Sequence, residues 1–306
     1  MAASKVPIYT ALFANLAIAI TKFIAAFITG SSAMISEGIH SLVDTGNEVL
    51  LLLGISRSQK PADAVRPFGY GKELYFWAFI VSLLIFAVGG GISLYEGILH
   101  LLEPEPIEQP FWNYCVLGVA MVFDGISFIT AIKEFNRQRG DQPFWEAVNR
   151  SKDPSTFVVL FEDAADVIGL FVAFMGIFLG QVLHNPYLDG VASIIIGLLL
   201  IGVSLLLARE SRSLLMGESA DTEQLKAVVA LAEADDAVQK VVHAPSMHLA
   251  PEEIIVVLLI TFHDQLQSTD VADAVNRIRK KIQQDHPLFK QIFIQPQLPP
   301  GKDIPV

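Results

Sequence analysis

Four ionisable residues recur at helical spacing inside a long apolar part of the sequence. The segment SEGIHSLVDTGNE contains Glu37, His40, Asp44 and Glu48 between two apolar runs. Because residues three and four apart share one face of an α-helix, these side chains form a polar stripe. Ionisable groups at membrane depth are costly unless they face a bundle interior or a wet cavity, where they commonly mark an ion pathway. The stripe therefore indicates an ion-binding face or a buried polar network that holds helices together.

A second apolar segment, STFVVLFEDAADVIGLFVAF, repeats this pattern. It places Glu162 and Asp166 four residues apart, with Asp163 on a different helix face. Two helices thus each offer a pair of candidate ligands, His40 with Asp44 and Glu162 with Asp166. One imidazole nitrogen and three carboxylates can surround a divalent cation, and such N/O ligation suits zinc, while carboxylate-rich sites also accept manganese or iron. We therefore expect a divalent cation site between the two helices.

The composition is that of a membrane protein. Of 306 residues, 52% are hydrophobic and 17% charged, whereas a soluble domain carries about 25% charged residues. A helix needs about 20 mostly apolar residues to cross roughly 30 Å of hydrocarbon. Six stretches meet this length, near residues 7–29, 33–55, 74–101, 112–134, 155–182 and 187–208.

The character of the chain changes after the sixth stretch. From about residue 217, helical periodicity over 221–235 and 268–284 alternates with strand-like runs over 237–249, 252–263 and 290–297. We predict an all-α bundle of six transmembrane helices over residues 1–212, followed by a small α+β domain of order αββαβ over residues 213–306.

The distribution of basic residues predicts the orientation in the membrane. Lys and Arg occur in the loops after the second, fourth and sixth stretches, whereas the opposite loops TGSS, LLEPEPIEQP and VLHNPY lack them. By the positive-inside rule, both termini and the small domain face the cytoplasm, which places a bacterial chain in the plasma membrane.

Several classes of function are disfavoured. The formal net charge of −11 argues against a nucleic-acid partner, which would need a basic surface. The single cysteine, Cys115, allows neither an intrachain disulfide nor a multi-cysteine metal site. The chain has no phosphate-binding G-x-x-x-x-G-K-[ST] loop and no H-E-x-x-H motif, so we expect neither an ATP-driven pump nor a zinc protease, and no enzyme.

The sequence resembles the cation diffusion facilitator family along nearly its whole length. The likeness rests on GSSAMISEGIHSLVDTGNEVLLLLG, KPADAVRPFGYGKELYFW, KDPSTFVVLFEDAADVIGL and LLMGES. It looks most similar to a subgroup containing a mitochondrial zinc transporter, in which the pair on the fifth helix begins with Glu. The resemblance implies a homodimeric efflux transporter that exchanges divalent cations, mainly zinc, for protons across the lipid bilayer. It also implies a cytoplasmic, ferredoxin-like dimerisation domain and assigns the transported cation to His40, Asp44, Glu162 and Asp166.

The chain departs from the family at two further metal sites. Relatives carry an Asp and two His in the loop after the second helix, but here Asp63 is accompanied by Arg66 and Tyr70, and an arginine stays protonated and cannot ligate a metal. We expect Asp63 to cap a helix or pair with a charge in the loop. In the small domain, His243 remains, while the other approximate ligand positions hold Leu258, Asp273, Gln295 and Gln297. We therefore expect no strong regulatory metal site there.

The sequence leaves some alternatives open. Manganese or iron could replace zinc as the substrate, and a transport-inactive metal sensor or scaffold is a further alternative. Asp124 could support the site, relay protons or pair with a polar neighbour, and Lys22 could snorkel or form an ion pair. Glu37 and Glu48 could attract cations or hydrogen-bond to the ligands.

Overall fold

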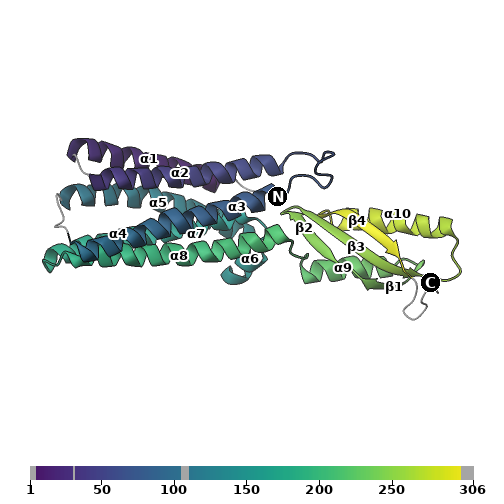
Figure 1. The fold of residues 1–306 in the computed structure, drawn as a ribbon. Coiled ribbons are helices and arrows are strands. Elements are labelled where there is room, and N and C mark those ends of the chain that lie inside the picture. The colour runs from purple at the N-terminus through teal and green to yellow at the C-terminus, as the bar shows by residue number, and fades with distance from the viewer. Residues whose placement is uncertain (1–4, 30–31, 105–109, 298–306) are drawn as a thin grey trace. The chain divides into compact units, whose positions relative to one another are not determined.

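The membrane part of the chain consists of long helices and one short helix (Figure 1). The computed structural model describes residues 5–29, 32–104 and 110–297. Successive helices are α1 (Val6–Thr29), α2 (Ser32–Ser58), α3 (Glu73–Leu84), α5 (Pro110–Arg139), α6 (Phe144–Arg150), α7 (Pro154–Val182) and α8 (Tyr187–Met216). Helix α3 runs through a π-helical turn, η1 (Ile85–Gly90), into α4 (Gly91–Leu102), so the predicted third stretch is a single interrupted helix.

Within the described residues, five helical segments are long and apolar enough to cross a membrane by length and composition. They are Val6–Ala25, Glu73–Leu102, Phe111–Arg139, Pro154–Val182 and Tyr187–Met216. The predicted stretch 33–55 is helical as α2 but is not among the five. Its polar stripe accounts for the difference, because Glu37, Asp44 and Glu48 lie within the helix.

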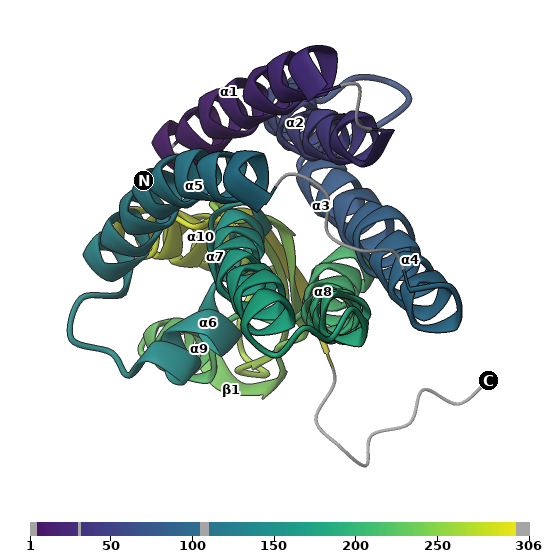
Figure 2. The same ribbon diagram turned by 90° about the vertical axis from the view of Figure 1, so that its left-hand side faces the viewer.

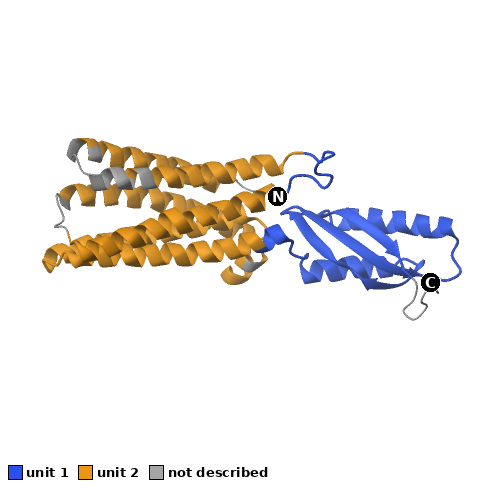
Figure 3. Ribbon diagram, viewed as in Figure 1, with its two compact units in different colours: residues 1, 61–72, 213–306 blue, residues 2–60, 73–212 orange. Residues whose placement is uncertain are grey.

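Two compact units make up the chain (Figure 3). The helical unit, orange in Figure 3 and called the first unit below, contains residues 2–60 and 73–212, and the sheet-containing unit, blue and called the second unit below, contains residues 61–72 and 213–306. In the first unit, α1 packs against α2, α5 and α7, and α5 also packs against α7. An end view shows these helices grouped together, with α4 beside α8 (Figure 2). Polar side chains of α2, α5 and α7 thus share one interior with α1.

Glycines allow α4 and α8 to approach closely. A Cβ atom at Gly97 would lie 2.8 Å from the Ile194 backbone nitrogen, and one at Gly197 would lie 2.7 Å from the Leu94 nitrogen. Membrane helices commonly use small residues in this way, because interhelical packing rather than the hydrophobic effect drives their association. The two helices are therefore held by backbone contact as well as by side chains.

The second unit contains a mixed four-stranded sheet and two helices. Its elements are α9 (Thr222–Glu233), β1 (Val238–His243), β2 (Ser246–Ala250), β3 (Glu253–Phe262), α10 (Ser268–Asp285) and β4 (Phe289–Pro296). Strands β1 and β2 pair antiparallel with β3, and β4 pairs parallel with β3 after the α10 crossover. The fold class is as predicted, an α-helical membrane region followed by a small α+β domain.

The predicted first strand, 237–249, is broken into two. Strand β1 pairs with the C-terminal half of β3, at Leu259 to Phe262, and β2 pairs with its N-terminal half. Pro245 lies at the break, where it lacks an N–H group for the ladder. Its carbonyl oxygen still accepts a hydrogen bond of 2.9 Å from the Val257 N–H. The element order is therefore αβββαβ, with β1 and β2 sharing one edge of β3.

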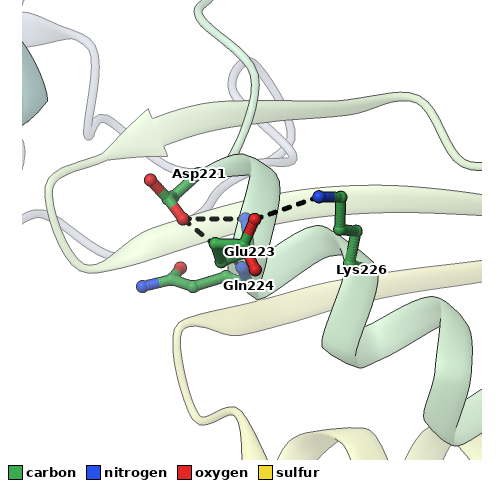
Figure 4. Close-up of polar contacts among 4 residues, drawn as sticks. All are labelled: Asp221, Glu223, Gln224 and Lys226. Carbon is green, nitrogen blue, oxygen red and sulfur yellow. Dashed lines mark hydrogen bonds and ion pairs between the residues drawn. The ribbon is translucent and has the colours of Figure 1, made fainter.

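Alternate residues of β3 form the core of this unit. Ile254, Val256, Leu258 and Ile260 are fully buried and cluster with residues of α9 and α10. Helix α9 begins where Asp221 accepts hydrogen bonds from the backbone N–H groups of Glu223 and Gln224 (Figure 4). Such a cap stabilises a helix start by about 1 kcal/mol.

The loop of residues 61–72 packs within this second unit. The ring of Phe68 meets that of Phe293 on β4 edge-to-face, with centroids 6.4 Å apart. Gly71 lies so close to β2 that a Cβ atom there would be 2.5 Å from the Leu249 carbonyl oxygen. Lys72 donates a hydrogen bond of 3.3 Å to the Leu215 carbonyl oxygen. The loop is thus an integral part of the unit that contains the sheet.

We predict that Gly97→Ala destabilises the protein by about 1–3 kcal/mol, because its Cβ would overlap the Ile194 backbone, which cannot move as a flexible side chain can. The measurement is thermal unfolding of the purified protein in detergent. Gly118→Ala on α5 is the matched control, since no atom lies within 4 Å of a Cβ there. Equal melting temperatures for the two variants would contradict the close packing of α4 and α8.

Candidate cation-binding site

Three of the four predicted ligands can be placed with their side chains. Asp44 lies on α2, and Glu162 and Asp166 lie on α7; Asp44 and Asp166 are half-buried, while Glu162 is 4% exposed. His40 lies on α2 one turn before Asp44, but its side chain is outside the described residues, as is that of Glu37. The helices therefore supply the predicted ligands from two elements distant in sequence.

A hydrogen bond between α2 and α7 joins these two helices at the predicted site. The Asn47 side-chain amide donates to Glu162 Oε1 over 3.1 Å, and the two residues are 115 positions apart. Asn47 follows Asp44 by three residues, so both lie on the same face of α2. The face of α2 that carries Asp44 is thus turned toward the face of α7 that carries Glu162.

Other buried carboxylates around the site also accept hydrogen bonds from neutral side chains. Glu48 Oε1 accepts from the Asn15 amide of α1 over 3.2 Å. Asp163 Oδ2 accepts from the Ser127 hydroxyl of α5 over 2.7 Å, in agreement with its predicted position on a different face of α7. These contacts tie α1 to α2 and α5 to α7 through polar groups inside the bundle.

A buried lysine is part of the same interior. Lys22 of α1 donates to the Ser41 hydroxyl of α2 over 2.9 Å, and both side chains are buried. Lys22 also attracts the carboxylate of Asp124, which is buried on α5. The side chain of Lys22 therefore points into the bundle and does not snorkel toward a membrane surface.

The carboxylates of α2, α5 and α7 act on one another electrostatically. Glu162 lies within electrostatic range of Glu48, Asp166 and Asp44. Asp166 interacts with acidic groups of all three helices, namely Asp44, Asp124, Asp163 and Glu48. Burying several like charges together is costly unless cations or protons compensate them. The arrangement is suited to binding positively charged species.

The described side chains do not yet form a closed metal-binding cage. In the part of the chain that the structure describes, no three His, Cys, Asp or Glu side chains are grouped in a way that could hold a metal ion. Glu162 Oε1 is occupied by the Asn47 amide, whereas Glu162 Oε2 is buried and has no hydrogen-bond partner among the described residues. The Oε2 atom is therefore the oxygen through which Glu162 can bind a cation.

Sequence reasoning missed the neutral residues of the site. Asn47, Asn15 and Ser127 hold Glu162, Glu48 and Asp163 in place, yet amides and hydroxyls occur widely in membrane helices. The spacing of Asn47 from Asp44 was a usable signal, because it extends the polar face of α2 by one turn. Asn15 and Ser127 offered no such signal.

The loop after α2 uses Asp63 to close itself. Asp63 Oδ1 accepts from the backbone N–H groups of Val65 and Arg66, over 2.9 and 2.7 Å, and Oδ2 accepts from the Tyr70 hydroxyl over 2.6 Å. The Arg66 guanidinium lies 4.6 Å from the centroid of the Tyr70 ring. The Tyr70 hydrogen bond, followed by that from Arg66 N–H, lowers the pKa of Asp63. Asp63 thus organises the loop, by hydrogen bonds within it and not as a helix cap.

Two candidate ligand positions of the small domain, His243 and Gln295, lie on the strands either side of Leu259 in β3. Leu258 is fully buried in the sheet core, whereas His243 is exposed at the end of β1. His248 is buried on β2, with Nδ1 3.4 Å from the Ala250 carbonyl oxygen. That this domain lacks a strong regulatory metal site stays a prediction.

The apolar helices and the buried carboxylates of α2, α5 and α7 define a multi-pass membrane protein with an acidic interior. Residues 8–216 match the model of the cation efflux transmembrane domain. The chain belongs to the cation efflux, or cation diffusion facilitator, family, which confirms the resemblance seen in the sequence.

Relatives of the chain include transporters of more than one metal. The mouse proton-coupled zinc antiporter SLC30A9, mitochondrial, is 39% identical over 222 residues, which cover 72% of this chain and 39% of the relative. Metal tolerance protein C4 of Arabidopsis thaliana is 28% identical over 265 residues, which cover 86% of this chain and 58% of the relative. The manganese efflux system protein MneP of Bacillus subtilis is 25% identical over 292 residues, which cover 93% of this chain and 92% of the relative. The match thus spans about two fifths of the zinc antiporter but nearly all of the manganese exporter.

We predict that Tyr70→Phe raises the pKa of Asp63 toward the ordinary value of about 3.9. Because the folded-state pKa of Asp63 lies below its unfolded value, this group stabilises the fold above about pH 4 and loses that effect as the pH falls through the folded pKa. The measurement is a pH titration of the aspartate ¹³C carboxyl signals. The exposed Tyr95→Phe is the control, and an unchanged Asp63 titration in Tyr70→Phe would disprove the role of the hydroxyl.

Proposed function

We propose that this chain transports divalent cations, with zinc as the main substrate, out of the cytoplasm in exchange for protons. The observation that carries the proposal is the hydrogen bond between Asn47 and Glu162, since it brings the carboxylate-bearing faces of α2 and α7 together inside the bundle. Membership of the cation efflux family supports transport over an enzymatic role. The names of the mammalian relatives, proton-coupled zinc antiporters, support both the metal and the coupling.

His40, Asp44, Glu162 and Asp166 are the proposed ligands of the transported cation. Imidazole and carboxylate groups bind a metal only in their deprotonated forms, so metal binding releases protons and protonation expels the metal. This competition couples the two fluxes without a nucleotide. Alternating access then exposes the same ligands to one side of the membrane at a time.

The rest of the molecule has a supporting part in this proposal. Residues 1–212 form the transport domain, and residues 213–306 form a dimerisation domain, so that the working unit is a homodimer. Both termini face the cytoplasm, because the basic loops of the sequence lie on that side. In a bacterial cell the transporter would lie in the plasma membrane.

Manganese is the second candidate substrate. It is favoured by the match to a manganese efflux protein over nearly the whole of both chains and by the number of carboxylates around the site. Carboxylate oxygens suit manganese, whereas an imidazole nitrogen favours zinc. Flux measurements in proteoliposomes with an imposed pH gradient separate the two metals. Absence of any metal-dependent flux would favour a sensor or scaffold role.

We predict that Asp44→Ala and Glu162→Ala each lower proton-driven zinc flux at least tenfold, because each removes one of only four ligands. The measurement is zinc uptake into proteoliposomes, with gel filtration to verify that each variant remains folded. Glu146→Ala is the matched control, since this exposed carboxylate of α6 pairs with Arg150 away from the bundle interior. Wild-type flux in either ligand variant would place the site elsewhere.

We predict that His40→Asp retains transport but shifts its preference from zinc toward manganese and cadmium. The substitution removes the only nitrogen ligand and leaves four carboxylates, which are more hospitable to harder cations. The measurement is competitive flux of zinc against manganese and cadmium, with wild type alongside. An unchanged preference would show that His40 does not ligate the transported ion.

A further inference from the structure

Three buried oxygen atoms of α2 and α7 side chains have no hydrogen-bond donor among the described residues. They are Asn47 Oδ1, Glu48 Oε2 and Glu162 Oε2. Asn47 and Glu48 are each 1% exposed and Glu162 is 4% exposed. Leaving a buried acceptor unsatisfied costs about 1–3 kcal/mol, and more where the group is charged. Three such atoms on two facing helices require an explanation.

In each of these three side chains, the other polar atom forms a hydrogen bond. Asn15 donates to Glu48 Oε1, and the Asn47 amide nitrogen donates to Glu162 Oε1. The donors are neutral amides, so they orient the side chains without cancelling a negative charge. As a result, one oxygen of each carboxylate is fixed and the other is left available, together with the amide oxygen of Asn47.

The three side chains are also close in the bundle. Asn47 and Glu48 lie one turn beyond Asp44 on α2, and Asn47 contacts Glu162 directly. Glu48 follows Asn47 on α2, and α1, which holds its other oxygen through Asn15, packs against both α2 and α7. Two carboxylates and one amide oxygen would balance the charge of a divalent cation and satisfy all three open acceptors.

We propose that Asn47 Oδ1, Glu48 Oε2 and Glu162 Oε2 form a second cation position, the oxygen-only position, beside the set that contains His40. With no nitrogen or sulfur donor, its ligands suit a hard divalent cation such as Mn²⁺. The inference rests on the proposed function and extends it. Glu162 belongs to both sets, so the two positions are occupied in turn, and an ion moves between them by exchanging its other ligands.

The test is Mn²⁺ binding to the full chain in lipid nanodiscs at pH 7.5. Binding is measured as the loss of the aqueous Mn²⁺ signal in electron paramagnetic resonance. Asp44→Ala removes a ligand of the first set and is expected to retain one Mn²⁺ per chain. Asp44→Ala combined with Glu48→Gln is expected to weaken that binding at least tenfold. Glutamine keeps the acceptor for Asn15, so the polar contact that orients position 48 is preserved.

Asp44→Ala with Glu146→Gln is the matched control, because Glu146 is an exposed carboxylate of α6 that pairs with Arg150, and its neutralisation should leave Mn²⁺ binding unchanged. Loss of all binding in Asp44→Ala, or binding insensitive to Glu48→Gln, would overturn the oxygen-only position. Zinc flux in the wild-type protein tests the proposed function separately, and its absence beside intact Mn²⁺ binding would overturn that function alone.

Discussion

The cost of burying carboxylates in an apolar bundle is the constraint on which the rest of this structure depends. Glu48, Glu162 and Asp163 lie in the interior, each oriented by a hydrogen bond from an amide or a hydroxyl group. Helix α2 must therefore pack against α1, which supplies Asn15 to Glu48, and α7 must meet α2 and α5, which supply the donors to Glu162 and Asp163. The need to give each buried carboxylate a hydrogen-bond donor thus determines which helices are neighbours in the bundle.

This constraint also explains the uneven apolarity of the helices. Helix α2 holds the acidic stripe, and among the described residues it is not one of the segments apolar enough to span a membrane by length and composition. It contacts α1 and α3, which reduces its exposure to lipid. Helices α4 and α8, in contrast, meet through glycine contacts that involve no charge. One part of the bundle is thus specified by polar contacts and another by close backbone packing.

The spacing of polar residues made much of the site predictable from the sequence. The i, i+4 pairs predicted that polar faces of α2 and α7 meet, and the hydrogen bond between Asn47 and Glu162 confirms that contact, while the cation ligands stay a prediction. Which neutral groups orient the acids could not be deduced, since the contact between Asn47 and Glu162 spans 115 residues. Pro245 is a sequence signal for a break in the strand. The strand-like pattern of residues on both sides of it nevertheless suggested one continuous strand.

The use of neutral donors distinguishes this interior from one built for stability. An arginine or lysine bound to Glu48 or Glu162 would form an ion pair that an incoming cation must break, with the charge of that partner left behind. An amide instead holds one oxygen and leaves the carboxylate charge available to the ion. A hydrogen bond of this kind can persist when the ion leaves, so the empty and occupied states share the same scaffold. Carboxylates oriented by neutral donors, as Glu48 and Glu162 are, are what a site needs if it must bind a cation and then release it.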